Sequence, residues 1–150
     1  MRDILTANII LTLSVFAWAM AQILKVVVIF IQYRKIEWNM ILSGGGMPSS
    51  HSAFVCACAT STGMTCGFSS PMFALAAAFA FIVMYDAANV RHAAGEQAKI
   101  LNYIMDSWSE LRPEFFVENL KELLGHTPLQ VFFGALLGIL IGVGGYYLIF

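Results

Sequence analysis

Charged residues are scarce in this chain of 150 residues. Asp, Glu, Lys and Arg make up 11% of the sequence, whereas a soluble globular domain averages about 25%. None of the four occurs from Trp38 to Tyr85, and none occurs from Thr127 to Phe150. Hydrophobic residues reach 59%. The composition therefore predicts an integral membrane protein and excludes an ordinary soluble domain.

Basic tracts and a cysteine framework are also lacking. The formal net charge is −1, and no run of Lys or Arg marks a nucleic-acid surface, so we expect no nucleic-acid partner. The three cysteines, Cys56, Cys58 and Cys66, lie in an apolar segment. Their odd number and close spacing favour packing residues over a disulfide framework or a zinc site. In the leading interpretation we expect neither a metal nor a cofactor.

Four apolar stretches have about the length that crosses a bilayer as a helix. A hydrocarbon core of about 30 Å needs roughly 20 helical residues. The first stretch is longer than the apolar part of a signal peptide, about 7–15 residues. The second consists of small residues, which let helices approach closely in lipid, so we expect it at the centre. The stretches are Ile4 to Ile31, Ser50 to Cys66, Met72 to Asn89 and Pro128 to Phe150.

The segment between the third and fourth stretches is polar and amphipathic. Apolar residues recur at helical spacing in two runs within Ala93 to Gly125, which predicts two amphipathic helices along the membrane interface. In the fourth stretch, Gly134, Gly138 and Gly142 repeat every four residues and predict a flat strip against a neighbouring helix. The expected fold is all-α: residues 1–150 form one membrane domain, a bundle of about four transmembrane helices.

Basic residues are distributed unevenly about these spans. Four crossings place the end of the first span, the start of the second, the end of the third and the start of the fourth on one side. Seven of the eight Lys and Arg residues lie on or near that side, and only Arg2 lies on the other. Because positive charge marks the cytoplasmic side, we expect this face in the cytoplasm and both termini outside. We expect the membrane to be a bacterial cytoplasmic membrane.

All three histidines fall on this basic face. His51 and His126 each lie at the start of a predicted apolar helix, in short segments whose Gly, Pro and Ser residues are typical of helix starts. Ser49 and Ser50 directly precede His51. Amides at a helix start also bind anions, and histidine exchanges protons near neutral pH. His92 lies where a third apolar run ends. Ionisable groups are costly at the edge of hydrocarbon, so three such clusters together predict an active site.

The cluster around His92 allows three interpretations. Arg91 could grip phosphate oxygens at two points through its planar guanidinium. Asp86, His92 and Glu96 could instead be ligands of a divalent metal. Asp86 and Arg91 could also form a purely structural ion pair at a helix end. Similarly, Lys25 inside the first span is either a further phosphate-binding cation or a side chain that snorkels to the interface.

Two residues could hold the imidazole of His126 in one tautomer. Glu122 precedes it by four residues and Gln130 follows it by four, so each lies one helical turn away. The plain alternative is an interfacial histidine without a chemical role. For His51, the plain alternative is that the phrase around it only starts a helix.

These motifs resemble a known superfamily. Residues 48–51, Pro-Ser-Ser-His, are similar to the Pro-Ser-Gly-His motif of the type 2 phosphatidic acid phosphatases, a superfamily shared with the vanadium-dependent haloperoxidases. Residues 126–131, His-Thr-Pro-Leu-Gln-Val, resemble its third motif, a His followed four residues later by Asp. Nearly the whole chain is similar to the small divergent branch of that superfamily.

The resemblance implies a metal-independent phosphatase that acts on a membrane lipid phosphate or pyrophosphate, such as an isoprenyl phosphate or phosphatidate. His126 would be the nucleophile that forms a phosphohistidine, and His51 would protonate the leaving alcohol. The lipid bilayer and the lipid phosphate would be its partners, and the protein could also form a homo-oligomer. The residues expected to bind the phosphate are Lys25, Ser49, Ser50 and Arg91.

The chain departs from the superfamily pattern near the nucleophile. The orienting Asp is Gln130 here, so Glu122 or Asp86 would have to substitute for it. The position of the third-motif Arg is Leu120, so Arg91 would have to serve from an earlier helix. Two alternatives therefore accompany the phosphatase: a metal-dependent lipid phosphotransferase, and an inactive relative that binds a phospholipid head group or a partner protein.

Overall fold

The structure is a computed structural model, and it describes residues 8–34, 46–107, 120 and 125–149. These residues form helices joined by turns and contain no strand, so the predicted all-α class is confirmed. The elements are α2 (Ile9–Tyr33), α4 (Ser50–Cys66), α5 (Pro71–Tyr85), the π-helical segment η1 (Asp86–Val90), α6 (Arg91–Ser107) and α7 (Pro128–Ile149).

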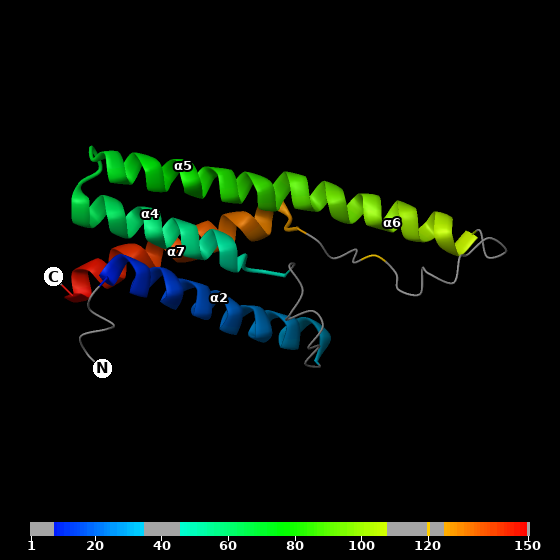
Figure 1. Cartoon of the computed structure of the whole chain (residues 1–150). Helices are drawn as coiled ribbons and strands as arrows, with labels where there is room; N and C mark the ends of the chain where they lie inside the picture. Colours follow the sequence, from blue (N-terminus) through cyan, green and yellow to red (C-terminus); the bar gives the residue numbers. More distant parts are fainter. Residues whose placement is uncertain (1–7, 35–45, 108–119, 121–124, 150) are drawn as a thin grey trace.

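Four of these helices, α2, α4, α5 and α7, lie together as a bundle (Figure 1). α4 packs against the other three, and it is therefore the central helix, as its small residues predicted. The start of α2 and the end of α7 lie at one end of the bundle (Figure 1). α4 and α7 both begin toward the opposite end, so the two histidine phrases are brought near each other by the topology.

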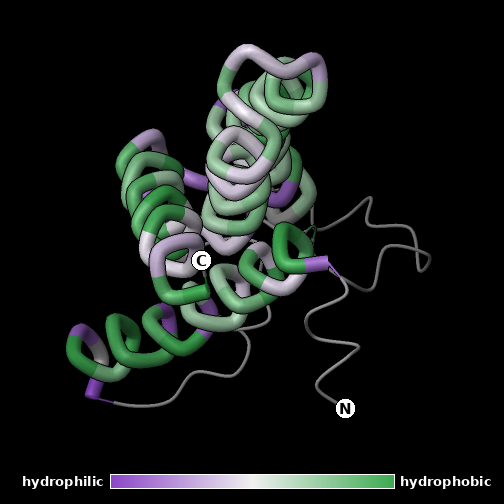
Figure 2. Tube along the Cα trace, turned by 90° about the vertical axis from the view of Figure 1, so that its left-hand side faces the viewer, coloured by the Kyte–Doolittle hydropathy of each residue, from purple (hydrophilic) through white to green (hydrophobic). Residues whose placement is uncertain are grey.

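The outside of the bundle is hydrophobic. α2, α5 and α7 are hydrophobic over most of their length (Figure 2), and large apolar side chains such as Leu75 and Phe81 are exposed. Ile9–Gln32, Pro71–Met105 and Pro128–Ile149 are each long and apolar enough to cross a membrane. The shorter α4, with 17 residues, lies among them. An apolar surface of this extent needs lipid around it, which confirms the predicted integral membrane bundle.

Glycines make the contact between α7 and α4 close. Gly134, Gly138 and Gly142 are buried. A Cβ at Gly134 would collide with the backbone oxygen of Ser49, and one at Gly138 would collide with that of Ala53. Close backbone approach of this kind stabilises helix pairs in lipid through van der Waals contact. The flat strip predicted from the four-residue repeat is confirmed.

Serine caps determine where α4 and α5 begin. Ser49 Oγ accepts a hydrogen bond of 3.3 Å from the backbone N–H of Ser52, and Ser70 Oγ accepts one of 3.2 Å from Phe73. Each cap satisfies an amide that the helix itself leaves without a partner. The cap at Ser49 places His51 in the first turn of α4.

α5 continues through η1 into α6 without a break, and α6 extends beyond the rest of the bundle (Figure 1). At the junction, the backbone N–H of Arg91 donates to the carbonyl of Asp86, five residues back, and not to that of Ala87. Large apolar residues of α6, among them Ile100 and Tyr103, are exposed. The second amphipathic run predicted before Gly125 lies outside the described residues, and the placement along the interface stays a prediction.

Candidate active site

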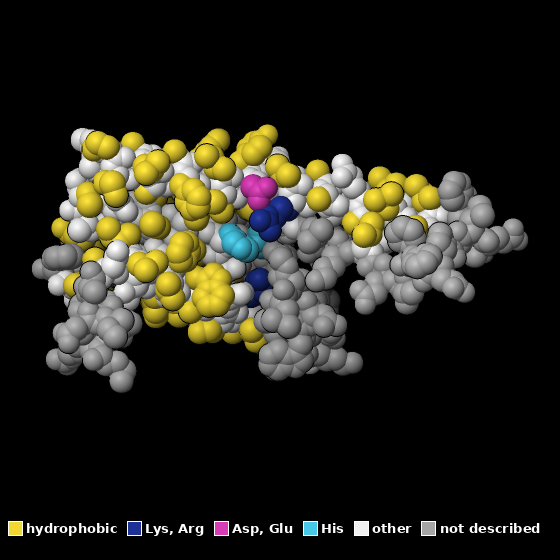
Figure 3. Space-filling model, viewed as in Figure 1, with side chains coloured by type: hydrophobic (Ala, Val, Ile, Leu, Met, Phe, Trp, Pro, Cys, Tyr) yellow, Lys and Arg dark blue, Asp and Glu magenta, His cyan; other side chains and the backbone are white. Residues whose placement is uncertain are grey.

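Histidine, basic and acidic side chains gather in one small region of a face that is otherwise hydrophobic (Figure 3). A cavity of about 50 Å³ lies among them. It is lined by the first turn of α4, the end of α5, η1, the first residue of α6 and the residues before α7. Four predicted site residues meet here: His51, Asp86, Arg91 and His126.

The backbone at His126 is held by the π-helical segment. Because the N–H of Arg91 bonds to Asp86, the Ala87 carbonyl is left to accept the backbone N–H of His126, at 2.9 Å. Gly125 permits this approach: its φ is +87°, and a Cβ there would collide with the backbone nitrogen of His92. Only glycine fits such a left-handed and crowded position without strain. Single π-helical turns inside α-helices are frequent at functional sites.

The His126 ring is fixed in one tautomer. Its Nδ1 lies 3.3 Å from Gln130 Oε1, and the same Gln130 atom lies 3.1 Å from the backbone nitrogen of Thr127. A backbone N–H can only donate, so that Gln130 atom is the amide oxygen, and Nδ1 must carry the ring hydrogen. Nε2 therefore keeps its lone pair. It is buried and has no hydrogen-bond partner among the described residues.

Burial keeps the His126 ring neutral. The side chain is 2% exposed, and burial lowers the pKa of His126 to about 4 because the imidazolium form loses its water. The hydrogen bond to Gln130 raises the pKa, whereas the charges of Lys25, His51 and Arg91 lower it further. At neutral pH the ring is uncharged, which is the form a nucleophile requires.

His51 faces His126 across the cavity. The ring centroids are 6.3 Å apart and the ring planes are inclined by 57°, so the rings are neighbours, and both line the cavity. His51 is exposed, unlike His126. A hydrogen bond of 3.0 Å from the backbone N–H of Ser49 to the carbonyl of Gln130 joins the two helix starts. The relative position of the rings is therefore fixed by the backbone.

Arg91 and Asp86 form the ion pair that was one of the three alternatives. Arg91 Nε lies 2.7 Å from Asp86 Oδ2, and the side chains are 60% and 39% exposed. An ion pair this exposed contributes about 0–1 kcal/mol, so it does not account for both residues by itself. The contact uses Nε alone. Within the described residues the two terminal NH₂ groups of the guanidinium make no hydrogen bond, which leaves them for a two-point grip on phosphate.

Lys25 is buried inside the protein. The side chain is 2% exposed and lies along Gly46, where a Cβ would come 3.1 Å from the Lys25 Cδ. Burial between α2 and the start of α4 does not fit a side chain that snorkels toward water. Ser49 and Ser50 are also buried. Neither lines the cavity, and the Ser49 hydroxyl lies 3.0 Å from that of Ser52 as part of the helix cap. Their predicted role toward phosphate stays a prediction.

Comparison with known proteins agrees with this picture. The sequence profile of the family described as "Divergent PAP2 family" matches residues 6–141, which include every candidate site residue. The chain belongs to this family. The chain is also 43% identical, over 147 residues, to the uncharacterized membrane protein YuiD of Bacillus subtilis (strain 168), with 91% of this chain and 93% of that protein covered. No solved structure matches the chain. The resemblance to the divergent branch is confirmed.

Gln130 occupies the position of the superfamily's orienting Asp, and it contacts the ring itself. Substitution by Asp86 is not what the structure shows, because the Asp86 carboxylate pairs with Arg91. The other expected substitute, Glu122, lies outside the described residues. The contact from Gln130 Oε1 to His126 Nδ1 shows that an amide oxygen can replace a carboxylate oxygen in holding the tautomer.

The alternative metal site is not assembled. Among residues 8–34, 46–107, 120 and 125–149, no group of three His, Cys, Asp or Glu side chains could hold an ion. Glu96 instead pairs with Lys99 at 2.7 Å, and Asp86 pairs with Arg91. Asp86, His92 and Glu96 therefore do not form a ligand set, although they follow one another along the same continuous helix.

Sequence reasoning missed two residues that position His126. Ala87 contributes only its carbonyl, and neither its side chain nor its spacing signals a π-helical turn. Gly125 precedes His126 directly, and a glycine before a functional helix start was a usable signal for a close backbone approach. Its partner, the junction of η1 and α6, could not be predicted because it lies more than thirty residues earlier in the chain.

Proposed function

We propose that the protein is an integral membrane phosphatase that hydrolyses a lipid phosphate or pyrophosphate through a phosphohistidine on His126. One observation carries the proposal: a neutral, buried imidazole keeps the lone pair of Nε2 free beside a cavity shared with His51 and Arg91. Most buried polar side-chain atoms have a hydrogen-bond partner, so an unpartnered Nε2 beside this cavity favours a chemical role. Membership of the Divergent PAP2 family supports the same reaction.

In the first step, the Nε2 lone pair of His126 attacks phosphorus and the bond from phosphorus to the alcohol oxygen breaks. His51 gives its proton to that oxygen, so a neutral alcohol leaves. The phosphorylated ring carries a positive charge, and Gln130 Oε1 stabilises it by accepting the Nδ1 hydrogen. In the second step, neutral His51 takes a proton from water. The resulting hydroxide attacks phosphorus, and the N–P bond breaks to release phosphate and restore Nε2.

Positive charge near the cavity supplies the binding energy for the phosphoryl group. The two free NH₂ groups of Arg91 bind two phosphoryl oxygens, and Lys25 contributes a buried charge that already affects the pKa of His126. Fixed charges in a site of low dielectric stabilise the developing charge of the transition state, which is the main source of rate in phosphoryl transfer.

The bundle sets the substrate's position in the membrane. The cavity is lined by the first turn of α4 and the residues before α7. Both helix starts lie toward the same end of the bundle (Figure 1), so a phosphate at the bilayer surface can reach the cavity. The basic asymmetry of the sequence assigns this face to the cytoplasm, in a bacterial cytoplasmic membrane. On this proposal residues 1–150 work as one helical domain.

The test is turnover by the purified protein in detergent. We expect release of inorganic phosphate from a panel containing phosphatidate, polyisoprenyl phosphate and polyisoprenyl pyrophosphate, inhibition by vanadate, and persistence in EDTA. Radioactive phosphate from a labelled substrate should be trapped as an acid-labile adduct on the protein. The His126→Ala protein, purified in parallel, controls for contaminating phosphatases. Release at the same rate from that control, or no release from any substrate, contradicts the proposal.

A second candidate function is binding of a lipid phosphate without turnover. The observation that favours it is Gln130: a neutral amide holds His126 where the superfamily has a carboxylate, and it stabilises the positive intermediate less. Saturable binding of a lipid phosphate, without phosphate release and without an adduct on His126, would establish this function in place of catalysis.

A further inference from the structure

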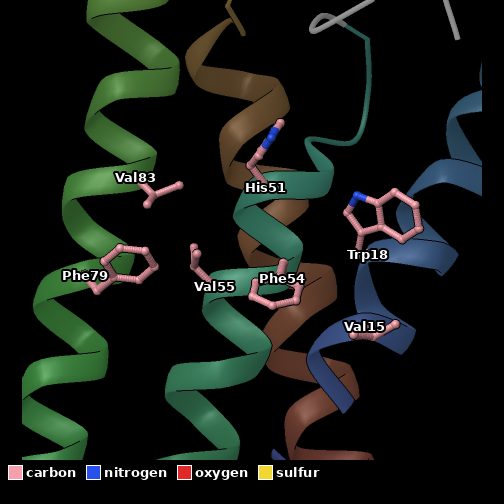
Figure 4. A pocket seen from close by; sticks show the side chains of 7 residues that line it. All are labelled: Val15, Trp18, His51, Phe54, Val55, Phe79 and Val83. Atoms are coloured by element: carbon pink, nitrogen blue, oxygen red, sulfur yellow. The ribbon is translucent and has the colours of Figure 1, made fainter. Parts of the chain in front are cut away.

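An apolar groove leads away from the cavity along α4. Its upper part has a volume of about 390 Å³, within the usual range of about 300–1,000 Å³ for small-molecule sites. Figure 4 shows Trp18 of α2 on one side of α4 and Phe79 and Val83 of α5 on the other, with Phe54 and Val55 of α4 between them. His51 is the one histidine in this lining.

The cavity and two apolar pockets, the upper and lower parts of the groove, follow one another along α4, and neighbouring ones share lining residues. His51 and Val83 line both the cavity and the upper groove. Phe79 lines both the upper groove and a lower part of about 560 Å³, which reaches Cys58, Leu75 and other apolar residues. A ligand with its polar head in the cavity can therefore place an apolar tail along the whole groove.

One face of α4 forms the floor. His51, Val55, Cys58, Thr62 and Cys66 line successive parts of the groove, and their spacing of three or four residues puts them on one side of the helix. The fifteen residue steps from His51 to Cys66 correspond to about 22 Å at 1.5 Å per residue. Half of the hydrocarbon core is only about 15 Å. The groove therefore extends past the middle of the bilayer.

The walls leave the groove open at the side. α2 and α5 each pack against α4, and the third face of α4 is covered by α7. Trp18 and Phe79 are 44% and 58% exposed, so the groove communicates laterally with the surrounding lipid. A chain can enter it from the bilayer without passing through water.

We infer that this groove binds a single long hydrocarbon chain, of a lipid phosphate whose phosphate occupies the cavity. The inference rests on the proposed function and selects among its substrates. A chain longer than one leaflet, as in a polyisoprenyl phosphate, fills both parts of the groove. On this inference the second chain of phosphatidate lies in the surrounding lipid and adds no contact in the groove. Burial of more methylene groups strengthens binding, so affinity rises with chain length until the chain reaches Cys66.

Photo-crosslinking tests the groove without requiring turnover. The probes are an octyl and a hexadecyl phosphate, each with a diazirine at the chain end, added to the full chain in detergent. We expect the octyl probe to label the peptide with Val55 or Phe79, and the hexadecyl probe to label residues near Cys58 and Leu75. Excess polyisoprenyl phosphate should compete with both. Labelling of outward residues such as Phe81, or labelling that no lipid phosphate reduces, overturns the inference.

A block in the lower groove tests the length dependence. Cys58→Trp fills the lower part with an indole, and Ile82→Trp places the same group on an outward residue of α5 that is 63% exposed. We expect the ratio of hexadecyl to hexyl phosphate affinity to fall on the order of tenfold or more in Cys58→Trp, because fewer methylenes are buried. The ratio should stay unchanged in Ile82→Trp. An unchanged ratio in both variants overturns the inference.

The two proposals fail in different ways. If the protein binds these probes in the groove but releases no phosphate, the proposed catalysis is contradicted, whereas the inference that the groove binds a hydrocarbon chain is retained. If it hydrolyses lipid phosphates with no preference for one long chain over two, the groove inference fails alone. A Cys58-to-Cys58 cross-link between two copies, insensitive to added lipid, would instead assign the groove to an interface and overturn the inference.

Discussion

The two histidines at the cavity begin from similar sequence phrases and end in opposite environments. His126 is 2% exposed, and its Nδ1 faces Gln130. His51 is exposed and lies where the cavity meets the groove. This difference fits the two roles in the proposed function: a buried ring with one fixed tautomer suits a nucleophile, whereas a ring in contact with solvent can exchange protons in every cycle.

The position of each histidine relative to its helix explains the contrast. His51 lies inside the first turn of α4, after the cap at Ser49, so its backbone is committed to the helix and its ring points away from the axis. His126 lies two residues before α7, and its backbone N–H is free to bond to Ala87. One residue is held by its helix, the other by a neighbouring helix.

Replacing each histidine with alanine is the strongest test of this contrast. His126→Ala removes the only covalent route, so we expect no phosphate release and no labelled intermediate. His51→Ala should lose about 10²–10⁴-fold with an alkyl phosphate, the usual contribution of a general acid. With an aryl phosphate, whose leaving group needs no proton, it should still form the intermediate. The measurement is radioactive labelling of the protein together with phosphate release.

The outcome that would contradict the assignment is equally specific. Labelled intermediate on His126→Ala would mean that another residue is the nucleophile. Equal losses in His51→Ala with alkyl and aryl phosphates would remove the general-acid role.

Arg91 also bears on the comparison of the two histidines, because its guanidinium would hold the phosphate in the cavity that both rings line. Arg91→Lys keeps the charge and loses the two-point geometry, so we expect the rate to fall roughly 10- to 100-fold, as for one charge-assisted hydrogen bond. Lys99→Gln is the matched control, because that basic residue on α6 pairs with Glu96 and lies outside the cavity. Similar activity in the two variants would remove Arg91 from the site.

Substitution of Gln130 allows the protonation of His126 to be followed through the pH dependence of activity. Burial lowers the pKa of His126 to about 4, so in the wild type the ring stays neutral above about pH 5 and causes no loss there. Gln130→Glu places a carboxylate at Nδ1, which favours the charged ring and raises that pKa. Protonation below the pKa inactivates the nucleophile, so the acid limb of kcat/KM should move to higher pH. Gln130→Leu should lose about tenfold without that movement.

Much of the fold could be predicted from the sequence, because a helix that crosses lipid must be both apolar and about 20 residues long. The length and apolarity of the stretches near Ile9–Tyr33 and Pro128–Ile149 predicted the outer helices, and small residues predicted α4 at the centre. The continuity of α5, η1 and α6 could not be predicted. Polar residues such as Asp86 and Arg91 normally suggest a helix end, and only the position of the Ala87 carbonyl shows why the helix continues through a π turn.

The residues of the site could be named in advance, but their contacts could not. His51, His126 and Arg91 were predicted from phrases far apart in the sequence, and the structure brings them to one cavity. Spacing alone could not decide whether Glu122 or Gln130 contacts the His126 ring, because each lies one helical turn away from it. The groove was not foreseen, because Trp18, Phe79 and Val83 look like ordinary lipid-facing residues until three helices place them together.

The glycine strip is the remaining link between the two histidines, and we expect its substitution to have the smallest effect on chemistry. At Gly138, a Cβ would collide with the Ala53 oxygen, so Gly138→Ala must push α7 away from α4. Gly144 has no heavy atom within 4 Å of a Cβ, so Gly144→Ala is the matched control. We expect Gly138→Ala to cost about 1–3 kcal/mol of stability, as overpacking does, and to lower the thermal unfolding temperature in detergent. Activity at low temperature should fall only a few-fold, because the hydrogen bond from Ser49 to Gln130 still joins the helix starts. Equal unfolding temperatures in the two variants would show that this packing does not hold the rings in place.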